Sequence, residues 1–404
     1  MISLYGYDMP ENTPKKQVCM VAYTTYEFDA RVRREAETLV SLNEYEVLFI
    51  VPKGGKIPRK RVVDGISVME LNTRKYQGNN KLRYIISYLN FTLSAFIKCT
   101  GLLFTRNIDI FHFHNMPDFL VFAGVIPRLF GKKIILDIHD TMPETYVTKF
   151  KKRGNILFKL FYMEEASSCK FAHKIICVNH IQRDILVERG IPGRKILVSM
   201  NVPDPKLFKN HEAAGTKSNG NFRLVYHGTL AERLGINLAL QAISKLNDKI
   251  PGLEFHIFGR INSAYGLKLV GLSRVLGTDP YVRFNKTVPM ESLLDVLEEM
   301  HLGIISNRKN MATELMLPVK MLEYITLGIP VIAPRLKTIQ YYFSDEMVRY
   351  FEPEDVDSLT DAILDLYHNK SKRIRQTKAA MEFIEKYGWE KQQMGLINLY
   401  RELE

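Results

Sequence analysis

LPVKMLEYITLGIPVIAP, residues Leu317–Pro334, is the stretch from which we interpret the rest of the chain. Residues 319–327 predict a short helix after Pro318, and Gly328 fits the position beyond a helix end, where a positive φ is wanted. The apolar run 329–333, bounded by prolines, is typical of a buried parallel strand. The stretch therefore predicts one helix–strand unit of an α/β protein.

Two charged side chains, Lys320 and Glu323, lie one turn apart on the same face of this predicted helix. A helix N-terminus presents free backbone N–H groups and the positive end of the helix dipole, which suit a phosphate. The same pattern also fits an ordinary amphipathic helix whose Lys and Glu form a solvated pair. Periodicity alone leaves a phosphate site and a surface ion pair both open.

Predicted strands and helices alternate along the whole chain, which indicates α/β domains with mostly parallel sheets covered by helices on both faces. The predicted strands are residues 17–23, 45–52, 66–71, 108–112, 133–137, 174–178, 196–198, 223–227, 254–259, 282–285, 302–306 and 329–333. The predicted helices include residues 29–42, 84–104, 118–130, 234–246, 290–299, 319–327, 358–368, 370–387 and 389–404. In such sheets, ligands bind at the carboxyl ends of the strands.

A segment rich in Pro, Gly, Ser and Asn, residues 201–221, lacks periodicity and marks a linker. The length agrees, because 404 residues exceed one typical core and suit two domains of about 200 residues each. We therefore predict an N-terminal Rossmann-like domain over 1–200, a C-terminal one over 222–388, and a final helix over 389–404.

Positive charge is concentrated in the first half of the chain. Residues 1–200 carry 30 Lys and Arg against 19 Asp and Glu, whereas residues 201–404 carry 26 against 25. This asymmetry suggests an anionic partner such as nucleic acid, phosphate or a membrane surface. A nucleic-acid-binding protein is therefore one alternative, although the sequence has no recognisable motif for it.

Cysteine usage and the start of the chain both predict a cytoplasmic protein. The cysteines lack C-x-x-C spacing, which argues for a reducing compartment and against a zinc site. They are Cys19, Cys99, Cys169 and Cys177. Residues 1–14 are polar and have no apolar core of a signal peptide.

One apolar segment, residues 84–104, is long enough to cross a bilayer of roughly 30 Å. Asn90, Ser94 and Lys98 interrupt it, so we expect a buried or membrane-skimming helix rather than a span. A basic stretch precedes this segment, and its charges are Lys53, Lys56, Arg59, Lys60, Arg61, Arg74, Lys75, Lys81 and Arg83. We expect the two together to dock on an anionic membrane, unless the helix is core and the charges are solvated.

Two histidine-bearing strand ends stand out in the first half: HFHN at residues 112–115 and DIHD at residues 137–140. A structural role would explain each histidine separately, whereas two converging ends indicate a polar site. H-x-H also fits a zinc site, but no Cys, Asp or His at ligand spacing completes a set. We predict no metal.

The D-x-D sequence Asp355-Val356-Asp357 could hold a divalent metal on a diphosphate. It precedes Ser358 at a predicted helix start, where acids and hydroxyls act as caps. We interpret it as structural. In the second half, Gly228 ends a predicted strand and permits close approach to a ligand, and Arg233 can offer donors to phosphate.

The pattern P-x-K-x-x-E-Y followed by G-x-P-V-I-A resembles the nucleotide-sugar signature of glycosyltransferase family four, which has the GT-B fold. The resemblance covers most of the chain and is strongest over residues 224–333. It implies two Rossmann-like domains with parallel sheets facing a central cleft, and a last helix that crosses back to the first domain. It also implies retention of anomeric configuration, with no cofactor and no metal requirement.

The resemblance assigns roles to individual residues. Glu323 would hold the donor ribose, and Arg233 and Lys320 would bind the diphosphate. The full donor-binding set is Gly228, Thr229, Arg233, Pro318, Lys320 and Glu323. The catalytic set is His114, His139 and Asp140. The acceptor-side set is Asp29, Arg33, Asn115 and Glu144.

We therefore expect a cytoplasmic transferase of class EC 2.4, docked peripherally on the membrane. It would move a sugar from a nucleotide sugar to a glycan or lipid-linked acceptor in cell-surface polysaccharide synthesis. A nucleotide-sugar epimerase or hydrolase of the same fold remains an alternative, since it would need no acceptor.

Overall fold

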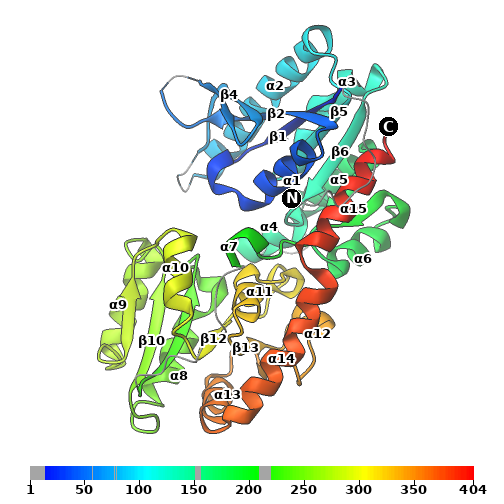
Figure 1. Ribbon diagram of the computed structural model, residues 1–404. Coiled ribbons are helices and arrows are strands. Elements are labelled where there is room, and N and C mark those ends of the chain that lie inside the picture. Colours follow the sequence, from blue (N-terminus) through cyan, green and yellow to red (C-terminus); the bar gives the residue numbers. More distant parts are fainter. Residues whose placement is uncertain (1–13, 57, 77, 79, 151–155, 209–219) are drawn as a thin grey trace. The chain divides into compact units, whose positions relative to one another are not determined.

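The computed structural model describes residues 14–404 apart from 57, 77, 79, 151–155 and 209–219, and its chain forms two compact units (Figure 1). Unit 1 takes the described residues of Met1–Tyr146, Lys151–Ser199 and Gln393–Glu404. Unit 2 takes those of Val147–Phe150 and Met200–Gln392. The chain thus changes unit just before the predicted linker, part of which lies outside the described residues.

Unit 1 is built on an eight-stranded sheet in the order β3-β4-β2-β1-β5-β6-β7-β8. All pairs are parallel except β3 with β4. The strands are β1 (Lys16–Ala22), β2 (Tyr45–Lys53), β3 (Lys60–Val63), β4 (Ile66–Arg74), β5 (Ile110–His114), β6 (Lys133–Ile138), β7 (Lys174–Cys177) and β8 (Ile196–Val198). The strand order reverses between β1 and β5, which is where a ligand crevice forms in open parallel sheets.

Helices cover both faces of this sheet. Those of the unit are α1 (Ala30–Ser41), α2 (Lys81–Thr105), α3 (Val125–Leu129), α4 (Met142–Phe150, which runs into unit 2), α5 (Ile156–Phe171), α6 (His180–Glu188) and α15 (Trp389–Arg401), with 3-10 turns η1 (Tyr26–Phe28), η2 (Asp118–Gly124) and η3 (Gly193–Lys195). One apolar core joins the sheet to α2, η2, α5 and α6. A second core, on the other face, joins it to α1 and α15.

Unit 2 has a six-stranded parallel sheet in the order β11-β10-β9-β12-β13-β14. Its strands are β9 (Phe222–His227), β10 (Leu253–Phe258), β11 (Val282–Asn285), β12 (Leu302–Ile304), β13 (Val331–Pro334) and β14 (Arg349–Phe351). Its helices are α7 (Pro205–Phe208), α8 (Ile236–Ser244), α9 (Ala264–Val275), α10 (Met290–Leu297), α11 (Val319–Thr326), α12 (Lys337–Tyr342), α13 (Val356–His368) and α14 (Lys370–Tyr387), with η4 (Glu232–Leu234) and η5 (Thr313–Leu315). The order is that of a Rossmann sheet, with its reversal between β9 and β12.

The predicted fold class, two Rossmann-like domains of parallel strands and covering helices, is confirmed. The predicted helix 118–130 is wrong in type, because its first part is the 3-10 turn η2 and the α-helix starts only at Val125. That start places Pro127 in the first turn, where its missing N–H costs no hydrogen bond.

Further differences concern strands, and strand β14 was not predicted. Strand β3 was not predicted, although the turn that joins it to β4 contains Asp64 and Gly65, both at positive φ, a recognised hairpin signal. Strand β5 runs through His114 and does not end at His112 as predicted, so both histidines of the H-x-H pattern belong to the strand.

Candidate functional site

The predicted donor residues gather at the strand-order reversal of unit 2. Gly228 and Thr229 follow β9, Arg233 lies in the turn η4 that comes next, and Lys320 and Glu323 lie on α11, which connects β12 to β13. Pro318, the N-cap residue, precedes that helix. These residues therefore surround the crevice at the carboxyl ends of β9 and β12.

Two glycines give this crevice its shape. Gly228 has φ +103°, and a Cβ there would lie 3.4 Å from the Lys320 Nζ. Gly235, with φ +65°, starts α8, and its Cβ would lie only 1.9 Å from the Ser306 carbonyl oxygen. The turns after β9 and β12 thus approach each other more closely than any side chain on Gly235 would permit.

Lys320 is a half-buried cation in this crevice. Its Nζ lies 3.8 Å from the centroid of the Tyr226 ring, which is a cation–π geometry. Burial, together with the charge of Arg233, lowers the pKa of Lys320 to about 7, although Glu323 acts in the opposite direction. The side chain is therefore poised to gain a full charge when an anion arrives.

Glu323 is 8% exposed, and its Oε2 lies 3.1 Å from His227 Nε2. The solvated Lys–Glu pair that periodicity left open is thus not what the structure contains. Arg233 is exposed, and its Nη1 lies 3.1 Å from the Met316 sulfur. Among the described residues no carboxylate pairs with its guanidinium, which leaves the fork of donors available for a phosphate.

A cluster of polar side chains, the unit 1 cluster, lies on the face of the unit 1 sheet that α1 and α15 cover. His114 on β5 is directly opposite Asp137 on β6. Arg31 of α1 donates two hydrogen bonds to Asp137, from Nε to Oδ2 at 2.8 Å and from Nη2 to Oδ1 at 2.7 Å. Both side chains are buried, so loss of either partner would cost about 3–5 kcal/mol.

Asp137 also orients two imidazoles. Its Oδ2 lies 2.8 Å from His139 Nε2 and 3.1 Å from His114 Nδ1. His112 stacks on His114 with centroids 4.2 Å apart, and its Nδ1 lies 2.8 Å from the Tyr400 hydroxyl. His139 keeps 23% of its side chain exposed, whereas His114 and His112 are buried. The imidazole that a substrate can reach is therefore that of His139.

The charges of this cluster depend on one another. Burial alone would raise the pKa of Asp137, but Arg31 and His139 hold it well below its usual range. Burial would likewise lower the pKa of His139, yet Asp137 raises it. Burial and the proximity of Asp137 raise the pKa of Glu35 to about 8, so this carboxyl carries its proton at neutral pH. The cluster therefore holds one strong anion, Asp137, between the Arg31 guanidinium and the His139 imidazole.

A metal is not the best occupant of this cluster. Glu35, His112, His114 and Asp137 each offer one ligand-type atom, all within 4.8 Å of one another. Neither acid lies at ligand spacing from the H-x-H pattern in the sequence, and the fold brings Glu35 and Asp137 to the two histidines. However, the Arg31 guanidinium already covers both oxygens of Asp137, where a second cation would be repelled. We interpret the group as a hydrogen-bonded network.

The remaining predicted residues of unit 1 have identifiable local contacts. Asp29 caps α1 and accepts a hydrogen bond from Thr24, and Arg33 pairs with Glu37 and Asp64 near the surface. Asn115 donates to Asp118 at 2.6 Å and to the Asp140 carbonyl at 2.8 Å.

Glu144 is buried against Arg189, whereas the Asp140 side chain is exposed. The acceptor-side roles of Asp29, Arg33, Asn115 and Glu144 stay predictions, as does the catalytic role of Asp140. The D-x-D acid Asp355 caps α13 through Ser358 N, as predicted.

Five members of the unit 1 cluster were not among the predicted site residues: Arg31, Glu35, His112, Asp137 and Tyr400. Arg31 and Glu35 are spaced i, i+4 on the buried face of α1, and that spacing on an apolar stripe was a usable signal. Tyr400 is 288 positions from its partner His112, and no local pattern indicates that contact.

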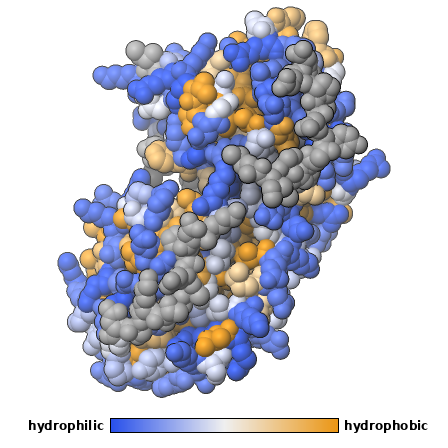
Figure 2. Space-filling view, in the orientation of Figure 1, coloured by the Kyte–Doolittle hydropathy of each residue, from blue (hydrophilic) through white to orange (hydrophobic). Residues whose placement is uncertain are grey.

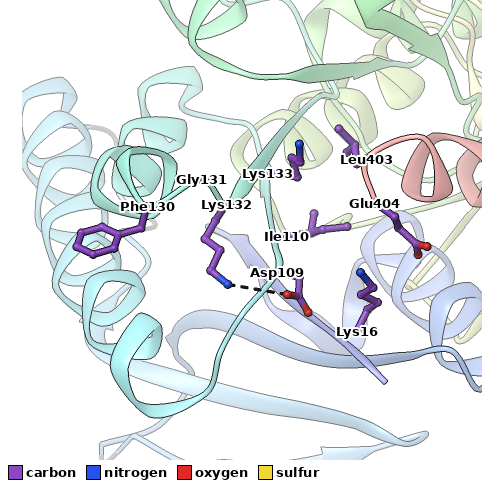
Figure 3. A pocket seen from close by; sticks show the side chains of 9 residues that line it. All are labelled: Lys16, Asp109, Ile110, Phe130, Gly131, Lys132, Lys133, Leu403 and Glu404. Carbon is purple, nitrogen blue, oxygen red and sulfur yellow. Dashed lines mark ion pairs between the residues drawn. The ribbon is translucent and has the colours of Figure 1, made fainter. Parts of the chain in front are cut away.

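A cavity of about 210 Å³ lies at the opposite edge of the unit 1 sheet, where the strands begin (Figure 3). Lys16, Ile110 and Lys133, the first residues of β1, β5 and β6, line it. Lys132 points toward Asp109 across it, at 3.9 Å. Since ligands of parallel sheets bind at the carboxyl ends of strands, this cavity is not part of the candidate site.

Comparisons with known proteins agree with the fold. The family model described as "Glycosyltransferase Family 4" matches residues 30–205, and the one described as "Glycosyl transferases group 1" matches residues 221–369. A search of curated protein sequences found no match for this chain.

Several solved structures share the fold. Sucrose-phosphate synthase from Thermosynechococcus elongatus aligns with a TM-score of 0.77 at 15% identity, over 96% of this chain and 99% of that one. HepE from Anabaena, solved in complex with UDP, aligns with a TM-score of 0.71 at 11% identity, over 96% and 100%. The lipopolysaccharide outer core galactosyltransferase WaaB aligns with a TM-score of 0.63 at 14% identity, over 96% and 99%.

The first prediction is that nucleotide binding is coupled to proton uptake by Lys320. A diphosphate beside Nζ would raise the pKa of Lys320 from about 7, so binding should take up a proton and affinity should fall as pH rises above neutrality. Calorimetry with a nucleoside diphosphate, in two buffers of different ionisation enthalpy at roughly pH 8, measures this uptake.

Lys320→Arg is the control, since a guanidinium stays charged throughout this range and should bind without uptake. Equal binding heats in the two buffers for the wild-type protein would show that no proton is taken up, and would contradict the role of Lys320 in binding the diphosphate.

The second prediction separates the two histidines. His139→Ala should lower kcat/KM for sugar transfer by about 100-fold and leave the Tm nearly unchanged, because this ring is accessible. His114→Ala should also lower the Tm by several degrees, because it leaves a hole between His112 and Phe49. Thermal melts and transfer assays on both variants provide the comparison; a large Tm loss for His139→Ala would make it structural.

Proposed function

Because this chain belongs to glycosyltransferase family 4, we propose that it moves a sugar from a UDP-sugar to a lipid-linked or glycan acceptor in cell-surface polysaccharide synthesis. It is a nucleotide-sugar-dependent glycosyltransferase of class EC 2.4. The observation that carries the donor part is the meeting of Gly228, Arg233, Lys320 and Glu323 at the strand-order reversal of unit 2.

Each donor residue then has a distinct task. The Glu323 carboxylate accepts hydrogen bonds from the two ribose hydroxyls. Arg233 and Lys320 bind the diphosphate and stabilise the charge that develops on it as the sugar departs. Gly228 lets the phosphates approach the backbone, because a side chain there would meet Lys320. UDP is the proposed nucleotide because HepE, which shares the fold, was solved with it.

The acceptor half of the proposal is based on unit 1. The Asp137–His139 pair lies at the carboxyl edge of the sheet, with the His139 ring partly accessible. A hydrogen bond to Asp137 fixes the orientation of this imidazole, so its other nitrogen can hold a sugar hydroxyl in place. His114, Arg31 and Asp137 act behind His139 as positioning residues.

The surface of α2 supports a membrane-bound acceptor. On this helix Phe91, Ala95, Cys99 and Leu102 are buried in the core. At about 100° per residue, an outer stripe of apolar side chains faces the opposite way. Its members are between 46% and 73% exposed: Leu82, Ile86, Leu89, Leu93, Ile97 and Phe104.

Apolar surface continues beyond α2. Phe104 contacts the exposed Phe130 at the end of α3, with ring centroids 6.0 Å apart. Figure 2 shows apolar surface at the end of unit 1 where α2 and α3 are labelled in Figure 1. Leu82–Thr105 is also long and apolar enough to span a bilayer, with 22% of its most apolar window buried.

One apolar face of α2 packs on the sheet, so we propose that the other lies in the membrane interface. The protein would thus be a peripheral enzyme of the inner face of the cell membrane. The basic stretch before α2 would hold the anionic headgroups, at about 1 kcal/mol for each side chain near the surface.

The third prediction tests the donor site. Glu323→Ala should weaken UDP binding by about 1.5–3 kcal/mol, the usual cost of losing charged hydrogen bonds, while the protein stays folded. Calorimetry against UDP, GDP and ADP identifies the base, and the same variant is then compared with the wild-type protein. Glu314→Ala is the control, because it removes a nearby glutamate that is not among the proposed donor residues. The Glu314 carboxylate accepts a hydrogen bond from Lys337 N.

Unchanged affinity in Glu323→Ala would contradict the donor assignment. Turnover of the sugar nucleotide without transfer to any acceptor would favour the epimerase or hydrolase alternative.

The fourth prediction tests membrane docking. Leu89→Asn/Ile97→Asn should reduce sedimentation with anionic vesicles by about tenfold or more, because two side chains of the outer stripe no longer enter the acyl region. Binding should also fall steeply with added salt. Leu267→Asn/Val275→Asn replaces two apolar residues of α9 that as a pair are even more exposed than Leu89 and Ile97, and it should change nothing. Equal losses in both variants would mean that α2 does not dock.

A further inference from the structure

A cavity of about 710 Å³ lies in unit 1 between the end of β4 and the first half of α2. Residues 72–76 form one wall, and α2 forms the other through residues that include Arg83, Ile86, Asn90 and Leu93. The cavity is distinct from the donor crevice, which belongs to unit 2, and from the histidine cluster, none of whose residues lines it.

The walls of this cavity are held in place by a buried hydroxyl. Tyr23 follows β1, and its hydroxyl accepts a hydrogen bond from Tyr76 N at 2.8 Å and bonds Ser87 Oγ at 2.5 Å. Ser87 Oγ also donates to the Arg74 carbonyl at 3.0 Å. Hydrogen bonds through Tyr23 thus link the residues after β4 to helix α2. The protein therefore forms this cavity without a ligand.

The cavity is cationic. Arg74, Lys75 and Arg83 line it, and no acidic residue does. Within the described part of the chain none of the three forms an ion pair, while Lys75 Nζ lies 5.9 Å from the Tyr23 ring centroid. Three exposed cations around a concave surface favour a group with more than one negative charge, such as a phosphate or diphosphate.

The cavity is also continuous with the apolar stripe. Ile86 and Leu93 line it, and both belong to the outer stripe of α2 that the proposed membrane contact uses. A ligand in this place would have its charged end among the cations and an apolar part along α2. That division matches a phosphorylated lipid and does not match a free nucleotide, which has no hydrocarbon chain to cover the stripe.

Its position relates the cavity to the acceptor region. β4 ends at Arg74, β1 at Ala22 and β6 at Ile138, and these parallel strands have their carboxyl ends at the same edge of the sheet. The edge that carries His139 therefore also carries the mouth of the cavity. A lipid held there would present its headgroup on the side of the sheet where transfer is expected.

We propose that this cavity binds the phosphate or diphosphate of a lipid-linked acceptor, with Arg74, Lys75 and Arg83 on the anion and the hydrocarbon chain along the outer stripe of α2. The inference rests on the proposed function, since it names the acceptor class of the same enzyme. Asn90 and Ser94 line the cavity as well and supply neutral hydrogen-bonding groups beside the cations.

The test is sedimentation of the full-length protein with phosphatidylcholine vesicles that contain polyprenyl phosphate, polyprenol or phosphatidylserine. The wild-type protein should prefer the polyprenyl phosphate vesicles, and excess inorganic pyrophosphate should not displace it. Arg74→Ala/Lys75→Ala/Arg83→Ala should lose about tenfold or more of that preference. Asn90→Trp, which fills the cavity without changing charge, should lose it too.

The matched control is Lys56→Ala/Arg59→Ala/Lys60→Ala, which removes three exposed charges of the same basic stretch outside the cavity. Its binding to both anionic vesicles should fall, but the ratio of its binding to polyprenyl phosphate over phosphatidylserine should stay within about threefold of the wild-type ratio. Equal losses in the two triple variants, equal binding to phosphatidylserine and polyprenyl phosphate, or displacement by pyrophosphate would each overturn the proposal.

Calorimetry with UDP on the same proteins separates this inference from the proposed function. The cavity variants should bind UDP like the wild-type protein, because the donor residues lie in unit 2. Failure of the wild-type protein to bind any nucleoside diphosphate would contradict the proposed donor chemistry, and the vesicle results would still decide whether the cavity takes a lipid phosphate.

Discussion

Parallel strands bring all their carboxyl ends to one edge of a sheet, and this constraint governs both units of the protein. Each sheet reverses its strand order once, between β1 and β5 in unit 1 and between β9 and β12 in unit 2. At a reversal the connections leave in opposite directions and open a crevice. The candidate site residues lie where this topology leads us to expect them: the Asp137–His139 pair at the carboxyl edge of the unit 1 sheet, and Gly228, Lys320 and Glu323 at that of the unit 2 sheet.

Charges inside these units are stabilised by partners that the topology brings together. Arg31 reaches Asp137 from a helix on one face of the sheet, and the resulting anion orients His114 and His139. Such a buried pair contributes more to a defined geometry than to stability, because desolvation offsets much of its attraction. Lys320 has only a ring and a nearby carboxylate, so its charge is incomplete until an anion binds.

Helix α2 has two apolar faces, and only one of them belongs to the core. Phe91, Ala95 and Cys99 pack on the sheet, while Leu89, Leu93 and Ile97 remain exposed. A soluble protein has little reason to expose so regular a stripe, since large apolar patches mark interaction sites. The cationic cavity beside the stripe gives this surface a polar component. The membrane-bound phosphorylated lipid that we propose as ligand would account for both features together.

Local sequence patterns were enough to identify the class of fold and most of its elements. Apolar runs and the turn residues between them are local signals, and they located β9, β11 and α14 and the helix that contains Glu323. They also indicated that Asp355 caps a helix, because capping depends only on residues three positions apart. A local 3-10 turn, η2, was mistaken for an α-helix, since the two share a similar periodicity.

Which of these residues contact one another depends on how the distant parts of the chain fold together. Arg31 and Asp137 are 106 positions apart, and His112 and Tyr400 are 288 apart, so no window of sequence contains either pair. The sequence also could not show whether Lys320 and Glu323 are buried, because their spacing fits a solvated surface pair as well as a binding site. In the structure Lys320 packs against Tyr226 and Glu323 against His227, so the two do not form a solvated pair. Likewise, the composition of α2 gives its length and apolarity, but which stripe faces the core depends on the sheet beneath it. Solvent exposure and long-range contacts are properties of the folded chain, and they made His139, rather than His114, the accessible histidine.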